Sequence, residues 1–514
     1  MATYEETAHR IIKDAIKSAI FIDENAKEPY SDDKPQEADR SVALYNQFKD
    51  IGISLSVYKY SDTNYLTQKD YIFANRDLVL LDWKLEGEDH GGEKSLELLD
   101  EIVNRQRQIH FCVIYTSEKE DNVLKNILSY FSGSTKAEYD DLRMDLADKE
   151  EEIKEIMPIL NELSLKRFTD WKVSYNEIRR SKRELFSSIL ENIVCESSLC
   201  SLIKCGMAFD NDTIKSNIQE PCPSSIDSVL HTLCIENTII IILNKKDVNP
   251  DILFQKFGET ISTYRWGVMQ LAGLEMQNIQ KKKCSFIDEN ILRVTRKALG
   301  YHKSEDFDNF EDFLKNVMLE QQALNLRDEK LTLVEAIDRE QYDEKLQREY
   351  TSMNVFYNSV CLKKNKPISF GDVFRCGGEY YICITALCDC ARPGKRNNCF
   401  YFAKGTSITC NDALKIGDRG FISYLNNSEY VKWNIKSGSD EPVYIVPVSL
   451  LVPCNLIVDQ KIQVEKLDFE NGTSKIKTYV FEYVTTIKQN YTQRIANHAF
   501  THPVRVGIDF VKKK

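Results

Sequence analysis

The chain has 514 residues, of which 42% are hydrophobic and 29% are charged, a balance typical of a globular protein with roughly two to four domains. The formal net charge of -11 argues against broad binding to nucleic-acid phosphates, and no apolar run is long enough to span a membrane. The 15 cysteines and the lack of an N-terminal signal-peptide pattern lead us to expect a cytoplasmic protein with reduced thiols.

The first predicted strand ends on two acids. Apolar residues recur with helical spacing from Ala8 to Ala19, which predicts an extra helix directly before this strand. The apolar run 19–22 then leads straight into Asp23 and Glu24. Short apolar runs bounded by polar segments are typical of parallel strands that are covered on both faces.

A second apolar run, 78–81, ends on the single acid Asp82. The carboxyl ends of parallel strands lie at one edge of a sheet, so Asp23, Glu24 and Asp82 should converge there. Three acids in a small volume repel one another unless a divalent cation lies between them. Carboxylate oxygens favour a hard ion such as Mg²⁺.

Two further predicted strands end on a hydroxyl and on an amine. The run 109–115 leads into Thr116 and Ser117, and the run 238–243 leads through Asn244 into Lys245 and Lys246. More than a hundred residues separate these two runs. A long insertion is compatible with one sheet because the entropy of loop closure grows slowly with length.

An acid pair, a lone acid, a hydroxyl and a lysine, in this order, resemble the receiver domain of two-component response regulators, an α/β flavodoxin-like (CheY-like) fold. The resemblance implies that Asp82 is the phosphoacceptor and that Asp23, Glu24 and Asp82 hold Mg²⁺. It also implies that Thr116 is the switch hydroxyl and that Lys245 binds the phosphoryl group. A carboxylate can act as the nucleophile in such a transfer, with cations neutralising the phosphoryl oxygens.

Several assignments stay open from the sequence. A single aspartate after a buried strand is often a helix cap or a turn residue, and only the ordered set favours the receiver. Ser117 could replace Thr116 as the hydroxyl, and Lys246 could replace Lys245. The sequence Asn244–Asp247 also matches the N-K-x-D element of GTPases, but the chain contains no G-x-x-x-x-G-K-[ST] phosphate loop, so we reject that interpretation.

Composition and patterning divide the chain into five predicted segments. They are the first part of the receiver with its extra helix (1–118), a helical insertion (119–237), the second part of the receiver (238–261), a helical connector (262–356) and a C-terminal β-rich module (357–514).

The β-rich module has strand-like segments at 370–374, 380–385 and 443–448, which predict a small β-barrel or sandwich. A helix is predicted over 479–500 and a last strand over 505–510. We find no catalytic motif and no DNA-binding helix pair in this module, so we expect an interaction or regulatory domain and not an enzyme.

Cysteines are concentrated in the same module, at Cys383, Cys388, Cys390, Cys399 and Cys410. Their spacing does not match paired C-x₂-C zinc knuckles, so buried thiols are the favoured interpretation and zinc the alternative.

The resemblance makes the chain a phosphoacceptor in a bacterial phosphorelay, phosphorylated on Asp82 by a histidine kinase or phosphotransfer protein. The large insertion and the unrecognised output module are similar to the buffering receiver proteins of Detocs-type phage-defence relays, in which an effector response regulator would be a further partner. The alternatives are an effector switched on by phosphorylation and a docking protein that is not phosphorylated. We expect no membrane partner and no nucleic acid.

Overall fold

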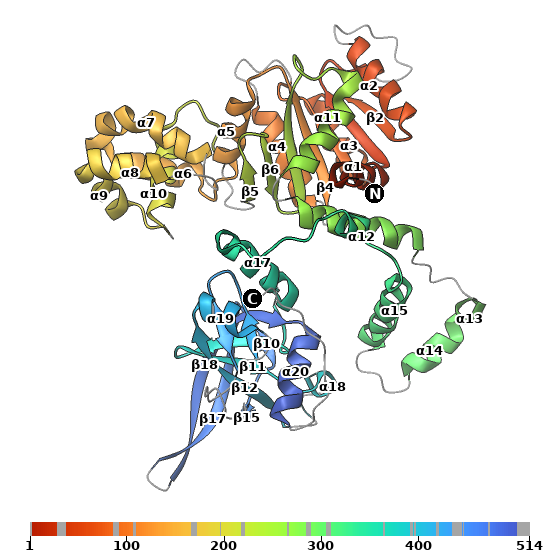
Figure 1. Ribbon diagram of the computed structural model, residues 1–514, viewed down its shortest axis with the longest axis vertical. Helices are drawn as coiled ribbons and strands as arrows, with labels where there is room; N and C mark the ends of the chain where they lie inside the picture. Colours follow the sequence, from red (N-terminus) through yellow and green to blue (C-terminus); the bar gives the residue numbers. More distant parts are fainter. Residues whose placement is uncertain are drawn as a thin grey trace. The chain divides into compact units, whose positions relative to one another are not determined.

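The computed structural model describes residues 3–500 except 28–37, 86–91, 106–108, 166–171, 196, 217–221, 265–266, 284–288, 305–309, 363–364, 391–393, 395–396, 418–420, 434–444, 446 and 471–472. The chain forms two compact units, Met1–Asp338 and Arg339–Lys514 (Figure 1). Within the described ranges, no helix combines the length and the apolar character that crossing a membrane would require.

A mixed sheet forms the centre of the N-terminal unit. Its strands are β1 (Ser18–Asp23), β2 (Ser54–Lys59), β3 (Leu78–Leu81), β4 (His110–Thr116), β5 (Pro223–Asp227), β6 (Thr232–Ile235) and β7 (Thr238–Asn244). They lie in the order β2-β1-β3-β4-β7-β6-β5, and the first five of these are parallel. The order of these parallel strands is that of flavodoxin-like folds, which confirms the expected α/β receiver architecture.

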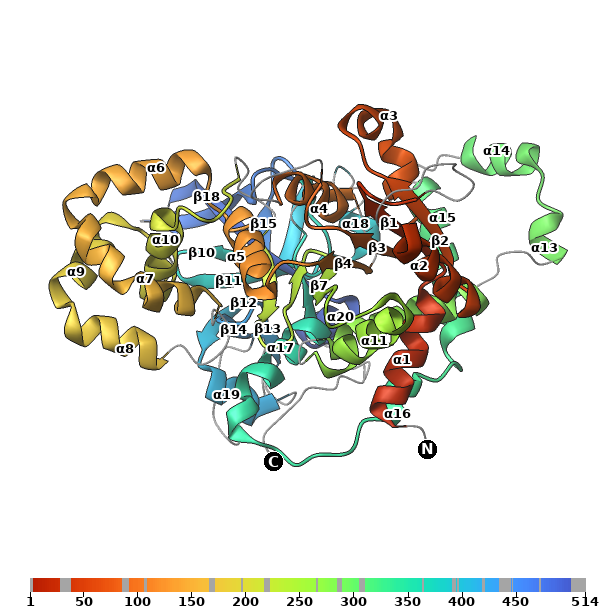
Figure 2. The ribbon, with the colours of Figure 1, turned by 90° about the horizontal axis from the view of Figure 1, so that it is seen from above.

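Two layers of helices cover the sheet because its central strands are apolar on both faces. Helices α3 (Asp62–Phe73), α4 (Glu93–Arg105) and α5 (Glu120–Tyr130) pack on one face. Helices α1 (Tyr4–Ala15), α2 (Ala38–Asp50) and α11 (Leu253–Thr263) pack on the other (Figure 2). The predicted extra N-terminal helix is α1, and it contributes Ala8, Ile11, Ile12 and Ala15 to this second layer.

The insertion between β4 and β7 begins with helices and ends with strands. After α5 it contains α6 (Lys136–Asp145), α7 (Glu150–Leu165), α8 (Lys172–Ser181), α9 (Arg183–Asn192) and α10 (Ser198–Phe209), with a 3₁₀ turn at Ala147–Lys149. The hairpin β5–β6 then joins the sheet antiparallel to β7. The residue pattern predicted only helices in this segment, and the hairpin was not expected.

The segment predicted as a helical connector is not confirmed as a separate element, because the boundary between the two units falls inside it. It contains α12 (Val268–Lys283), α13 (Glu289–Leu292), α14 (Arg296–Ser304), α15 (Phe310–Leu326), α16 (Thr332–Glu335) and α17 (Gln347–Asn358), preceded by a 3₁₀ turn at Glu344–Leu346. The buried carboxylate of Glu275 in α12 accepts hydrogen bonds from the backbone N–H groups of Thr332 and Leu333 at 2.8 and 3.1 Å. Arg10 of α1 also donates to Thr332 Oγ1. Helices α12 and α16 are therefore integral parts of the N-terminal unit.

The C-terminal unit is built on antiparallel strands. They are β8 (Ser359–Val360), β9 (Lys366–Pro367), β10 (Asp372–Cys376), β11 (Glu379–Cys383), β12 (Cys399–Ile408), β13 (Ile422–Tyr424), β14 (Tyr430–Lys432), β15 (Pro447–Leu451), β16 (Leu456–Ile457), β17 (Lys461–Glu470) and β18 (Thr473–Ile487). The pairings run from β11 through β10, β18, β17, β15 and β12 back to β11, which closes a barrel. The closed barrel agrees with the predicted β-rich module.

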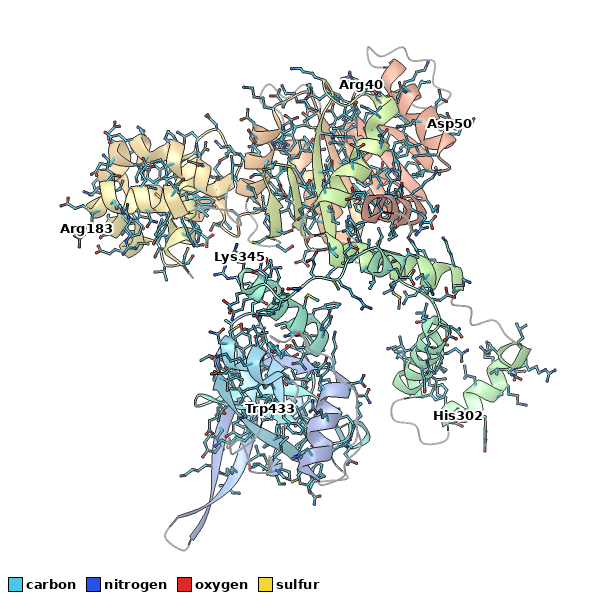
Figure 3. The ribbon with its side chains drawn as sticks, in the orientation of Figure 1. Arg40, Asp50, Arg183, His302, Lys345 and Trp433 are labelled. Carbon is cyan, nitrogen blue, oxygen red and sulfur yellow. The ribbon has the colours of Figure 1, made fainter. Side chains whose placement is uncertain are left out.

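The barrel has one core inside it and a second core on its outer side. Phe374, Phe402 and Phe481 fill the inside. Trp433, labelled in Figure 3, packs on the outer side with α20 (Gln489–Ala499). The short helices α18 (Leu387–Cys390) and α19 (Cys410–Ile416) complete the unit. Cys383 and Cys390 are buried in the inner core, and in the described part of the chain no group of cysteines, histidines or acids is arranged to hold a metal.

One prediction in this unit is wrong. Residues 479–487 form the second half of β18 and not the start of a helix, and α20 begins only at Gln489. Tyr479, Phe481 and Tyr483 alternate towards the barrel interior, and this period of two is typical of a strand and not of a helix. The strand predicted over 505–510 lies outside the described residues.

Candidate functional site

Two carboxylates meet where β1 and β3 end. Asp23 is the last residue of β1, and Asp82 directly follows β3. The two strands are adjacent and parallel, with Ile22 opposite Leu81, so both side chains project from the same edge of the sheet. Their exposed fractions are only 1% for Asp23 and 8% for Asp82. Two buried acids this close require a compensating positive charge.

Lys245 supplies positive charge at this position. It follows β7, and the register of β4 and β7 places Asn244 opposite Thr116. The Lys245 ammonium lies 3.0 Å from Oδ1 of Asp82 and 3.4 Å from Oδ2 of Asp23, and its side chain is 7% exposed. The neighbouring Lys246 is exposed. Of the two lysines that the sequence left open, Lys245 is the one in the site.

The two oxygens of Asp82 differ in their surroundings. Oδ1 accepts a hydrogen bond from the backbone N–H of Trp83 at 2.8 Å and also contacts Lys245. For Oδ2, no hydrogen-bond donor occurs among the residues that the structure describes. Burial raises the pKa of the Asp82 carboxyl to about 7, Lys245 opposes this shift, and the charge of Asp23 adds to it. Among the described residues, Asp82 is therefore a carboxylate whose Oδ1 is held in place by Trp83 and Lys245, whereas no such contact holds Oδ2.

The chain after Asp82 is held by packing and by one hydroxyl. Ser95 Oγ at the start of α4 donates to the carbonyl oxygens of Asp82 and Trp83 at 2.8 and 2.9 Å. The buried Trp83 ring lies directly against Gly92, where a Cβ atom would come within 2.3 Å of the ring. Gly92 also has a φ of +112°, which L-residues with side chains rarely adopt. The sequence places glycine here because neither the space nor the backbone accepts a side chain.

Thr116 ends β4 at the same edge and is 1% exposed. Its hydroxyl oxygen accepts the backbone N–H of Glu118 at 3.0 Å. Asn244 Nδ2 donates to the carbonyl oxygen of Glu118 at 2.8 Å, and the Glu118 carboxylate pairs with Lys84 at 2.7 Å. Thr116, Glu118 and Asn244 therefore connect the ends of β4 and β7, whereas Ser117 is exposed.

Glu24 directly follows Asp23, the last residue of β1. Its carboxylate accepts a hydrogen bond from Asn25 Nδ2 at 3.3 Å. Within the described ranges, no three side chains of Asp, Glu, His or Cys are arranged to hold a metal ion.

The donor set nevertheless fits a hard divalent cation. Two buried carboxylates face a single ammonium, so the cluster has an excess of negative charge when both acids are ionised, and all the anionic ligands are oxygens.

Three residues that shape the site were not predicted from the sequence. Ser95 and Asn244 make the backbone contacts described above, and Tyr115 packs beneath the site. The ring centroid of Tyr115 lies 5.8 Å from the Lys245 ammonium and 5.9 Å from the guanidinium of Arg40, which Figure 3 labels. The position of Asn244 at the end of an apolar strand was visible in the sequence. The contacts of Ser95 and Tyr115 had no local signal.

A polar cavity of about 790 Å³ adjoins this edge. Trp83 and Glu118 line it from the sheet side, and Lys125 of α5, Arg143 of α6 and Lys215 line it from the insertion. Burial and the nearby Arg143 lower the pKa of the Lys215 amine to about 8. Glu118 thus donates its backbone N–H to the Thr116 hydroxyl and also lines the cavity that residues of the helical insertion line.

Comparison with known proteins agrees with this geometry. A family model described as a response receiver domain matches residues 15–163, a segment that contains Asp23, Glu24, Asp82 and Thr116 and ends before Lys245. No curated protein and no solved structure gives a significant match to the chain. The matched segment spans β1 to β4 and extends into the helical insertion. The N-terminal unit of this chain therefore contains a response receiver domain.

Proposed function

We propose that this chain accepts a phosphoryl group on Asp82 from a histidine kinase or a phosphotransfer protein of a bacterial phosphorelay. The observation that carries the proposal is the asymmetry of the Asp82 carboxylate. Oδ1 is held by Trp83 and Lys245, and Oδ2 has no donor in the described part of the chain.

The proposed transfer balances with the groups present. Oδ2 of Asp82 attacks the phosphorus atom of a phosphohistidine, an O–P bond forms and the N–P bond breaks. The electron pair of the broken bond stays on the imidazole nitrogen of the donor. Lys245 keeps its proton throughout and neutralises part of the charge on the phosphoryl oxygens.

Mg²⁺ is the proposed cofactor, held by Asp23 and Asp82, with Glu24 as the further carboxylate next to the site. When bound, the ion would supply charge compensation that one ammonium cannot give to two carboxylates and a phosphoryl group. Asp23 contributes by its fixed position at the end of β1, where its Oδ1 accepts the backbone N–H of Asn25 at 2.7 Å.

Thr116 is the proposed switch residue. A phosphoryl group on Asp82 offers new acceptor oxygens at the edge of the sheet, and in this proposal the Thr116 side chain rotates to donate its hydroxyl proton to them. Rotation would break its contact with the N–H of Glu118. Because Glu118 lines the cavity towards the insertion, the proposed output of phosphorylation is a repacking of α5 and the insertion helices.

The proposed role in the relay is buffering: the chain draws phosphoryl groups away from an effector response regulator, as in Detocs-type phage defence, and is not itself an enzyme. A receiver without a recognised catalytic output supports this role. A second candidate is a docking receiver that is not phosphorylated. The contact of Lys245 with both carboxylates favours this second candidate, because the ammonium group then occupies the position that an activating cation would take.

The test is labelling of the full-length protein with radiolabelled acetyl phosphate and with a phosphorylated histidine phosphotransfer protein, each with Mg²⁺ or with a chelator. We expect Mg²⁺-dependent labelling that Asp82→Asn abolishes and that Asp141→Asn, a change of an exposed acid in α6, leaves intact. Labelling that persists in Asp82→Asn would place the acceptor elsewhere. Absence of labelling from both donors would favour the docking receiver.

A further inference from the structure

The two units carry charge of opposite sign. Residues 339–514 contain 25 Lys and Arg against 18 Asp and Glu, whereas residues 1–338 contain 43 against 61. The net charge of -11 therefore conceals a basic C-terminal unit. A strong charge asymmetry between the parts of a chain is typical of proteins that bind a polyanion with one of them.

Within the C-terminal unit, aromatic and basic side chains meet at one end of the barrel. A cavity of about 290 Å³ opens there between β11, β12, β15, β17 and β18. Tyr381, Tyr479 and Phe481 line it with rings, and Lys404 and Lys466 line it with amines. We call this cavity the barrel mouth.

The rings in the barrel mouth are held in place. The centroids of Tyr381 and Phe481 are 4.6 Å apart with planes inclined by 34°. The Tyr381 hydroxyl donates to Glu379 at 3.0 Å, and Lys404 pairs with the same carboxylate at 2.5 Å. Tyr479 lies next to them on β18 and is only half-buried. A flat apolar surface is thus fixed beside an ammonium group.

A pair of lysines continues this surface along β17 and β18, which project from the barrel as a two-stranded ribbon (Figure 1). Lys466 and Lys477 stand directly opposite each other in the register of the ribbon, next to the pair Val464 and Tyr479 on the same face. The two lysines therefore extend the basic lining of the barrel mouth along this face of the ribbon.

We propose that the barrel mouth and the adjacent face of the β17–β18 ribbon bind single-stranded nucleic acid. A base stacks on the rings of Tyr381 and Tyr479, and the phosphates next to it lie against Lys466 and Lys477. Stacking on aromatic side chains combined with a basic track is the general mode of sequence-tolerant single-strand binding. This inference goes beyond the phosphoacceptor role and does not depend on it.

The chemistry of the surface favours a single strand over other anions. A duplex keeps its bases stacked inside and presents its phosphates, so the rings of the barrel mouth would add nothing to its binding. An anionic lipid surface would likewise use the lysines without the aromatic cavity. The dependence of binding on Tyr479 therefore separates a single strand from a general polyanion.

The experiment measures binding of the full-length protein to a fluorescein-labelled single-stranded oligonucleotide of about 20 nucleotides by anisotropy, in DNA and RNA form, at about 50 to 200 mM salt. We expect Lys466→Gln combined with Lys477→Gln to weaken binding roughly tenfold or more at the lowest salt. The slope of log K against log salt should fall by about 1.4, the value for two lost phosphate contacts. Tyr479→Leu should weaken binding at least about fivefold.

The matched control removes the same charge elsewhere on the unit. Lys415 of α19 and Lys461 at the start of β17 are exposed and outside the barrel mouth, so Lys415→Gln with Lys461→Gln should bind like wild type apart from a minor electrostatic loss. Thermal unfolding of each variant verifies that the barrel remains folded.

Three results would overturn the proposal. The first is no binding at the lowest salt, and the second is an equal loss in the control pair and in the Lys466/Lys477 pair. The third is binding to a duplex or to vesicles of anionic phospholipid that matches single-strand binding and is indifferent to Tyr479→Leu. This last result would identify a general anion surface.

Discussion

The ammonium nitrogen of Lys245 lies 3.0 Å from Oδ1 of Asp82, although the entire helical insertion separates the two residues in the sequence. The insertion leaves and re-enters the sheet between β4 and β7, which remain direct neighbours. The polar edge of the receiver is thereby preserved, and the insertion is placed beside it.

The lysine contact predicts different results for two neighbouring residues. Lys245→Met should lower the initial rate of Asp82 labelling by acetyl phosphate at least about tenfold, because a charged hydrogen bond is worth about 1.5–3 kcal/mol. The labelling rate of Lys246→Met should stay within about twofold of the wild-type rate, because Lys246 is exposed. Lys245 is also the strongest influence that lowers the pKa of Asp82, so raising the pH should partly restore labelling of Lys245→Met. An equal loss of labelling rate in the two variants would show that Lys245 has no specific role in the phosphoryl transfer.

The raised pKa of Asp82 predicts a pH-dependent cost in stability. The carboxyl loses its proton near pH 4 when unfolded and near pH 7 when folded, so the folded state binds more protons in between and wild-type stability falls as the pH rises through this window. Asp82→Asn does not titrate. With a chelator present, its gain in stability over wild type should therefore be larger at pH 8 than at pH 5, by up to about 3 kcal/mol. Thermal unfolding of both proteins at the two pH values measures this, and a gain independent of pH would contradict it.

The fit of Trp83 against Gly92 predicts that this glycine cannot be replaced. Gly92→Ala would place a Cβ atom against the Trp83 ring at a residue with positive φ. It should lower the free energy of unfolding by about 3 kcal/mol or more. Gly52→Ala is the matched control, because Gly52 has a φ of +81° but open space around it. This change should lower the free energy of unfolding by only about 1 kcal/mol. Equal shifts of the unfolding midpoint would show that the Trp83 contact is unimportant.

The contact between Thr116 and Glu118 predicts that a substitution of Thr116 can abolish the conformational response without preventing phosphorylation of Asp82. Thr116→Val should still be labelled on Asp82, because it leaves both carboxylates and Lys245 intact, but it cannot exchange one hydroxyl contact for another. Hydrogen exchange over 117–130 should then change on phosphorylation of wild type and of Thr116→Ser, and remain unchanged in Thr116→Val. A full response in Thr116→Val would assign the switch to another residue.

Local patterns in the sequence were sufficient to predict the receiver fold and the residues at its polar edge. The apolar runs that end at Asp23, Asp82, Thr116 and Lys245 predicted both the parallel strands and their polar edge, because a strand covered on both faces cannot contain polar residues except at its ends. The same reasoning predicted the α/β fold, which the structure and the match to the receiver family support.

The tertiary structure alone decided what depends on pairing between distant segments. Only the register of β4 and β7 selects Lys245 over Lys246, since both follow the same apolar run. Closure of the barrel, the true strand β18 and the juxtaposition of Lys466 with Lys477 likewise arise from contacts across strands. A sequence pattern records which side of an element is apolar, but the identity of the partner on that side is set by the long-range packing of the whole unit.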